Sequence, residues 1–216
     1  MEKIRKLLQV PLIGLIVIPI GSVTFAATSS ISSSGPLIVP SDPEQSTTLP
    51  QRLTQRKSTL KLQLSNAQLQ SITKNCSVAQ TGLQDIKTRD QTAAQNRTQI
   101  YSDLATQLAT AINNLDNQSI DTTSLKAAQT QFDNAINKYL SDSIAYKTTM
   151  DDAVVMDCAS DPNGFEATIQ SARSLRTQLA NDASQIKSTI PQLVQALATE
   201  KEALIKSSST NGRPVQ

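Results

Sequence analysis

Histidine does not occur anywhere in the 216 residues of the chain. Imidazole is the most common general acid–base group and a frequent metal ligand, so its absence excludes Ser-His-Asp and Cys-His catalysis and nearly every zinc or haem site. The sequence also lacks a glycine-rich phosphate loop and a nucleophile elbow. We therefore expect no enzymatic activity, no catalytic residues and no cofactor.

Aromatic residues make up only 3% of the chain, tryptophan is absent, and there are only six glycines. Small and straight-chain apolar side chains suit the narrow core of a coiled coil better than the wide core of a sheet protein. The composition therefore favours an all-α fold with long helices.

Apolar residues recur in steps of three and four, which is the pattern of a helix that packs on other helices. The central seam comprises Leu125, Ala128, Phe132, Ala135, Tyr139, Ser143, Tyr146, Met150, Ala153 and Asp157. An earlier seam includes Ile100 and Leu104, and a later one includes Ile190 and Leu197. We expect these seams to form one shared core.

Two clusters of Asp, Asn, Ser and Thr, at 116–123 and 157–164, separate the seams and mark turns. We therefore predict an antiparallel up-down-up three-helix bundle over residues 51–206. Its helices are expected at about 51–116, 122–158 and 162–206, with a start of the first helix near Leu60 as the alternative.

Residues 1–26 have the pattern of an export signal. Three basic residues precede an apolar run at 7–20, and small residues surround the expected cut after Ala26. An uncleaved membrane anchor is the alternative, although the run is short for a spanning helix and Pro11 and Pro19 interrupt it. In either case the rest of the chain would lie outside the cytoplasm, secreted or associated with the cell envelope.

Residues 27–50 are rich in Ser, Thr and Pro and cannot bury enough apolar surface to order themselves. We expect a flexible linker there, either a stalk for the helical domain or a remnant of the leader. Residues 207–216 are expected to form a disordered tail.

The charge balance bears on the partners. The chain has 20 basic and 18 acidic residues, and the leader contains Lys3, Arg5, Lys6 and Glu2, so cleavage would leave 17 of each sign. Nucleic acid or an anionic membrane would require a basic surplus. We expect neither partner, except a membrane contact through an uncleaved N-terminal segment, and a homo-oligomer stays open.

The chain contains only two cysteines, Cys76 and Cys158. They lie about 40 residues before and after the predicted turn near Ser119, so an antiparallel helix pair would place both at the same end. In an exported chain we expect a disulfide, with two reduced buried thiols as the alternative. Redox catalysis is not expected, because there is no C-x-x-C motif and no histidine to activate a thiolate.

The only metal-site candidates are Asp157, Asp161 and Asn163, between the second and third predicted helices. Aligned with the EF-hand calcium loop, Asp161 and Asn163 match, but Ala159 and Gln170 stand where two essential ligands belong. Helix capping explains the same residues. We therefore expect capping there and no metal.

Three charged residues, Asp90, Arg97 and Arg176, occupy seam positions that would otherwise be apolar. One interpretation is that they pair across helices and set the register. The other is a locally hydrated seam in which Arg97 extends to solvent. Asp151 and Asp152 are expected on a solvated helix face.

Three short runs carry a resemblance to other proteins. They are 75–80 (Asn-Cys-Ser-Val-Ala-Gln), 156–162 (Met-Asp-Cys-Ala-Ser-Asp-Pro) and 172–176 (Ala-Arg-Ser-Leu-Arg). Over roughly residues 60–205 the chain resembles an uncharacterised family of exported α-helical coiled-coil proteins from small-genome bacteria. The resemblance implies a shared three-helix fold, no known activity and no functional residues to transfer.

The sequence has apolar helical seams but no reactive site. We therefore predict an exported structural or interaction protein, a helical spacer or binding module. Its partner would be an envelope or surface protein that the sequence does not identify. The alternative is a periplasm-type chaperone or carrier that holds apolar clients between helices, which requires a contiguous exposed apolar patch. A hydrolase or metalloenzyme would instead need a cluster of titratable residues in unusual surroundings.

Overall fold

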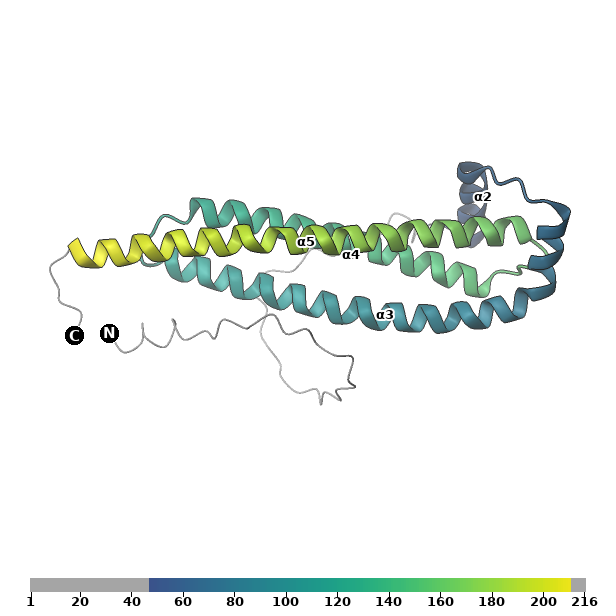
Figure 1. The fold of residues 1–216 in the computed structure, drawn as a ribbon, viewed down its shortest axis with the longest axis horizontal. Coiled ribbons are helices and arrows are strands. Elements are labelled where there is room, and N and C mark those ends of the chain that lie inside the picture. The colour runs from purple at the N-terminus through teal and green to yellow at the C-terminus, as the bar shows by residue number, and fades with distance from the viewer. Residues whose placement is uncertain (1–46, 211–216) are drawn as a thin grey trace. The chain divides into compact units, whose positions relative to one another are not determined.

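The structure is a computed structural model that describes residues 47–210 of the chain (Figure 1). The predicted signal segment 1–26 and most of the predicted linker 27–50 lie outside the described residues, as do residues 211–216 and the side chains of 207–210.

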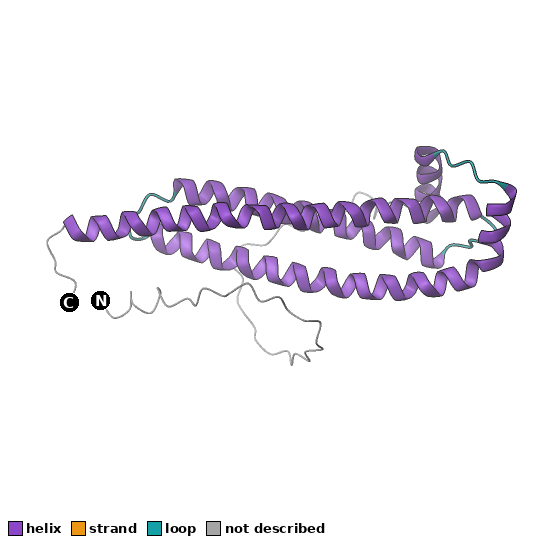
Figure 2. Cartoon of the chain, in the orientation of Figure 1, coloured by secondary structure: helices purple, strands orange, loops and turns teal. Residues whose placement is uncertain are grey.

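The described residues form four α-helices and no strand (Figure 2), which confirms the predicted all-α class. The helices are α2 (Leu49–Leu60), α3 (Asn66–Asp116), α4 (Thr123–Val155) and α5 (Pro162–Thr210). Within residues 47–210, no helix combines the length and the apolar character that crossing a membrane requires.

The prediction of one continuous helix at about 51–116 is wrong, because residues 61–65 break it into α2 and α3. Helix α2 ends at Leu60, and the next residue, Lys61, has a left-handed φ of 44°. Ser65 then caps α3: its hydroxyl accepts the Gln68 N–H at 3.3 Å, and the Gln68 side chain accepts the Ser65 N–H at 2.8 Å. This reciprocal cap satisfies two N–H groups and favours a new helix start over continuation.

The remaining helix ends differ from the predicted ones by a few residues. Helix α2 begins at Leu49, inside the predicted linker 27–50. Helix α4 ends at Val155 rather than near 158, because Asp157 turns the chain by accepting two backbone N–H bonds, both of 3.1 Å. Helix α5 continues through 207–210, which were expected in the disordered tail.

Helix α4 packs along both α3 and α5 and supplies the largest share of the core. Leu125, Phe132 and Tyr139 are at most 1% exposed. Every member of the predicted central seam is buried except Ser143, which is half-buried, and Asp157, which is exposed. Full burial of a large apolar side chain is worth roughly 1.5–3 kcal/mol, so this seam is a main source of stability.

A second apolar cluster surrounds the segment that follows α4. Its buried members are Ala153, Met156, Cys158, Phe165 and Ile169. Leu53 of α2 and Ile72 and Cys76 of α3 pack against it. Residues from all four helices therefore meet around this cluster, and α2 also packs on α5.

Helices α3 and α5 contact each other far less than either contacts α4. As a result, Ile100 and Leu104 of α3 and Ile190 and Leu197 of α5 are each more than a third exposed. The expectation that these seam residues belong to the shared core is wrong, because no neighbouring helix of the described part closes over them.

Two glycines provide a matched test of the cap at the start of α5. A Cβ on Gly82 would meet nothing within 4 Å, whereas a Cβ on Gly164 would lie 2.3 Å from Oδ2 of Asp161. Gly82→Ala should raise the free energy of unfolding by about 1 kcal/mol, because alanine favours a helix interior.

Gly164→Ala should instead lower the free energy of unfolding by about 1 kcal/mol. The displaced Asp161 carboxylate would lose its bonds to the Gly164 N–H and to Lys57. Urea unfolding measures both values, and equal effects of the two substitutions would contradict this account of the cap.

Candidate functional site

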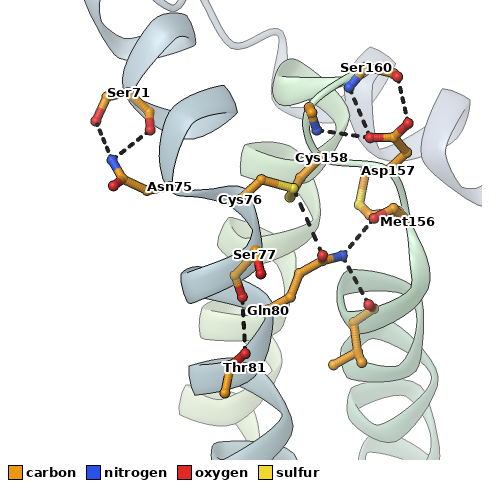
Figure 3. Close-up of a disulfide and its surroundings, with 12 residues drawn as sticks. Ser71, Asn75, Cys76, Ser77, Gln80, Thr81, Met156, Asp157, Cys158 and Ser160 are labelled. Atoms are coloured by element: carbon orange, nitrogen blue, oxygen red, sulfur yellow. Dashed lines mark hydrogen bonds between the residues drawn. A yellow bond between two sulfur atoms is a disulfide. The ribbon is translucent and has the colours of Figure 1, made fainter.

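Cys76 of α3 and Cys158, just past the end of α4, form a disulfide with their Cα atoms 5.6 Å apart (Figure 3). The two residues are separated by 82 positions, so the bond closes a loop that contains most of α3 and all of α4. Cys158 is fully buried. Cys76 is half-buried, and both residues belong to one apolar cluster, so the bond is suited to holding the helices together.

Gln80, one helical turn after Cys76, reinforces the same junction (Figure 3). Its side-chain amide donates hydrogen bonds to the main-chain carbonyl oxygens of Val154, at 2.9 Å, and Met156, at 2.7 Å. Carbonyl groups at the end of a helix lack partners within that helix. Helix α3 therefore supplies a cap for the end of α4 beside the disulfide.

Asp152 of α4 is the centre of a buried charged cluster. Arg52 binds both of its carboxylate oxygens, at 2.8 and 2.6 Å, and Arg56 binds Oδ2 at 2.7 Å. Arg56 also donates to the Thr149 hydroxyl at 3.2 Å. The bidentate geometry is the strongest form of an arginine–carboxylate contact. We call these four residues the Asp152 cluster; it holds α2 against α4.

The expectation that Asp151 and Asp152 share a solvated face is therefore wrong for Asp152, whose side chain is 4% exposed. Asp151 is 33% exposed and pairs with Lys87 and Lys147. The available signal was the spacing of Arg52 and Arg56, four residues apart and so on one face of a short helix.

Two of the three metal candidates bind protein groups instead. Asp157 accepts the Ser160 hydroxyl and backbone N–H, and these bonds hold the pKa of its carboxyl below the usual value. Asp161 caps α5 through the Gly164 N–H and pairs with Lys57. Asn163 is exposed. Among residues 47–210, no group of three or more His, Cys, Asp or Glu side chains is arranged to hold a metal ion.

Two of the three charged seam residues come together across the helices. Asp90 of α3 accepts the Tyr146 hydroxyl of α4 at 2.5 Å and the Arg176 guanidinium of α5 at 3.0 Å. Burial and the bond to Asp90 raise the pKa of Tyr146 above its ordinary value, so the phenol stays protonated and donates. We call Asp90, Tyr146 and Arg176 the polar layer; Arg97 makes no hydrogen bond with these three residues. Of the three charged seam residues, Asp90 is thus the one that contacts both neighbouring helices.

A hollow of about 340 Å³ adjoins this layer and has Arg97 in its wall. Asp90, Tyr139, Tyr146 and Arg176 also line it. We call it the polar hollow. Its charged and hydroxyl groups can bind a ligand, and sequence reasoning missed it because spacing along one helix does not show where small residues of two helices meet.

Asp182 of α5 is a second buried carboxylate that the sequence analysis did not single out. Its side chain is 2% exposed, and its Oδ1 accepts Lys138 of α4 at 2.7 Å. The other oxygen has no hydrogen-bond partner among the described residues. Burial, together with Asp142 on the same lysine, raises the pKa of the Asp182 carboxyl. The pair joins α4 to α5 but leaves part of a buried group unsatisfied, which limits its net contribution.

The contribution of the Asp152 cluster can be measured by removing the Asp152 carboxylate and, as a control, the neighbouring and more exposed Asp151 carboxylate. Asp152→Ala should lower the free energy of unfolding by about 3 kcal/mol or more, because it removes a buried carboxylate that accepts three charge-assisted hydrogen bonds. Asp151→Ala, the matched control, should cost less than about 1 kcal/mol, because its lysine partners are more exposed. Urea unfolding monitored by circular dichroism measures both free energies. Equal losses would contradict the prediction that the Asp152 cluster stabilises the protein more than the Asp151 pairs do.

The disulfide should supply a large fraction of the total stability. Closing a loop of this length is worth about 4 kcal/mol in the loop-entropy model. The double variant Cys76→Ala/Cys158→Ala should therefore lose about that free energy of unfolding relative to the oxidised protein. Dithiothreitol should destabilise the wild type comparably and leave the double variant unchanged. A loss below about 1 kcal/mol would contradict this role.

Comparisons with known proteins do not extend this description. The chain matches no family model, no curated protein and no solved structure. The resemblance to exported coiled-coil proteins of small-genome bacteria therefore stays a prediction. Any function must be argued from the geometry of the disulfide, the Asp152 cluster and the polar layer.

Proposed function

We propose that the protein is an exported structural or interaction module that acts outside the cytoplasm, as a helical spacer or binding surface of the cell envelope. In this proposal α3, α4 and α5 form an antiparallel up-down-up three-helix bundle, and α2 is a short additional helix packed on it. The N-terminal segment 1–26 directs export and is then removed or kept as an anchor.

Residue pairing across the helices supports this topology. Between α3 and α4 the pairs are Cys76 with Cys158, Lys87 with Asp151, Asp90 with Tyr146 and Tyr101 with Tyr139. Between α4 and α5 they are Ser124 with Glu200 and Lys138 with Asp182. In both series one residue number falls as the other rises, as expected for antiparallel neighbours.

The observation that carries the proposed role is the disulfide that joins α3 to the end of α4, with the Asp152 cluster on α4 beside it. Disulfides persist in oxidising compartments, which supports a location outside the cytoplasm. The strongest polar groups of this region bind one another across helices. Polar groups that are already bound to one another suit a structural or binding scaffold better than a reactive centre.

One observation favours the chaperone or carrier alternative. Ile190, Val194 and Leu197 of α5 are exposed and lie on one helix face, at steps of four and three residues. An apolar client would find a surface there. The alternative loses its support if the purified protein does not slow the aggregation of an unfolded test protein.

Export can be tested in intact cells with the full chain and a control that lacks residues 2–26. The full chain should be recovered outside the cytoplasm with both cysteines oxidised, whereas the control should be recovered reduced. Thiol alkylation followed by mass spectrometry reads the oxidation state and also shows whether peptides before Ala27 survive.

The interaction role is tested in the same cells by crosslinking. Envelope or surface proteins should be linked to the full chain and not to the control. Recovery of the full chain from the cytoplasm with reduced thiols, or links to cytoplasmic proteins alone, would contradict the proposal.

A further inference from the structure

The polar hollow lies where α3, α4 and α5 carry their charged and aromatic seam residues. Small side chains open it: Ala93 and Ala94 on α3 and Ala180 and Ala183 on α5 are in its wall. A leucine at such positions would fill the space in an ordinary helical core. At about 340 Å³, the hollow is at the small end of the range of ligand pockets.

The charges around the hollow are unequal. Asp90 is already engaged by Tyr146 and Arg176. Arg97 makes no hydrogen bond or ion pair with any residue of the described part, and its side chain is exposed at the hollow. One carboxylate therefore faces two guanidinium groups, and Arg97 is left with its donors available. This arrangement favours an anion.

Two tyrosines, Tyr139 and Tyr146, are among the lining residues of the hollow. The Tyr139 ring packs edge to face on Tyr101, with ring centroids 5.5 Å apart. Tyr139 is 1% exposed, so its ring is fixed by packing. The alanine side chains of the wall, packed next to this fixed ring, offer apolar contact to a ligand whose charged end lies at Arg97.

We propose that the polar hollow binds a small organic carboxylate. The carboxylate accepts two hydrogen bonds from the Arg97 guanidinium, whose planar fork matches its two oxygens. The apolar part of the ligand lies against the alanines of the wall. This binding activity goes beyond the proposed spacer role and does not depend on where the protein is located.

The composition of the chain offers a direct probe of binding. Tryptophan is absent and there are only three tyrosines, Tyr101, Tyr139 and Tyr146. Two of them line the hollow and the third packs on one of these, so tyrosine fluorescence reports on the site and its immediate surroundings. Phenylacetate serves as the probe, and phenethylamine, which carries the opposite charge on a similar frame, is the control ligand.

Phenylacetate should change the tyrosine fluorescence saturably below about 10 mM, and phenethylamine should not. Arg97→Gln should weaken phenylacetate binding about tenfold, because it removes a charge-assisted bidentate contact. Arg173→Gln, an exposed arginine of α5 outside the hollow, should leave binding unchanged. Ala180→Leu should abolish it by filling the space.

Circular dichroism shows that each variant is folded before it is titrated; Arg97 and Ala180 are both exposed, so their replacement should leave the fold intact. Three results would overturn the proposal: no saturable response to phenylacetate, equal responses to the acid and the amine, or unchanged affinity in the folded Arg97→Gln variant.

Discussion

The bond between Cys76 and Cys158 constrains the structure more than any other single interaction. The core contains few aromatic side chains and consists of a narrow apolar seam along α4. Such a core buries limited surface, so the entropy of the long α3–α4 loop would weigh heavily against folding. The disulfide removes much of that entropy from the unfolded state. It also joins residues that belong to one apolar cluster, so the covalent bond and the apolar packing stabilise the same part of the molecule.

The Asp152 cluster builds on this junction. Arg52 and Arg56 bring α2 onto a buried carboxylate of α4, and Leu53 packs on the apolar cluster around Cys158. The larger apolar core lies along α4, where Leu125 and Phe132 are almost fully buried. Helices α3 and α5 contact each other little, and Ile100 and Ile190 are exposed. Regions with fewer buried contacts open at lower free energy, and these are the regions from which binding surfaces are usually drawn.

Sequence reasoning reached the features that depend on local pattern. It found the all-α class from the seams, the cysteine pair from spacing about the turn, and the capping role of Asp161 from its position before a proline. It missed the break at 61–65, because apolar periodicity concealed the Ser65–Gln68 cap. It also misplaced Asp152, whose burial depends on α2, about 100 residues earlier in the chain. Periodicity shows which face of a helix is apolar but not whether a neighbour covers it, as Leu104 illustrates.

In the proposed bundle, α4 folds back along α3 so that the two cysteines meet. Lys87 of α3 and Lys147 of α4 bind the same Asp151 carboxylate, each at 2.6 Å, so their ammonium groups are close neighbours. A short amine-reactive crosslinker followed by peptide mass spectrometry of the monomer measures this proximity directly. The account predicts an abundant link between Lys87 and Lys147 and none between Lys87 and Lys126, at the other end of α4. The reverse pattern would contradict it.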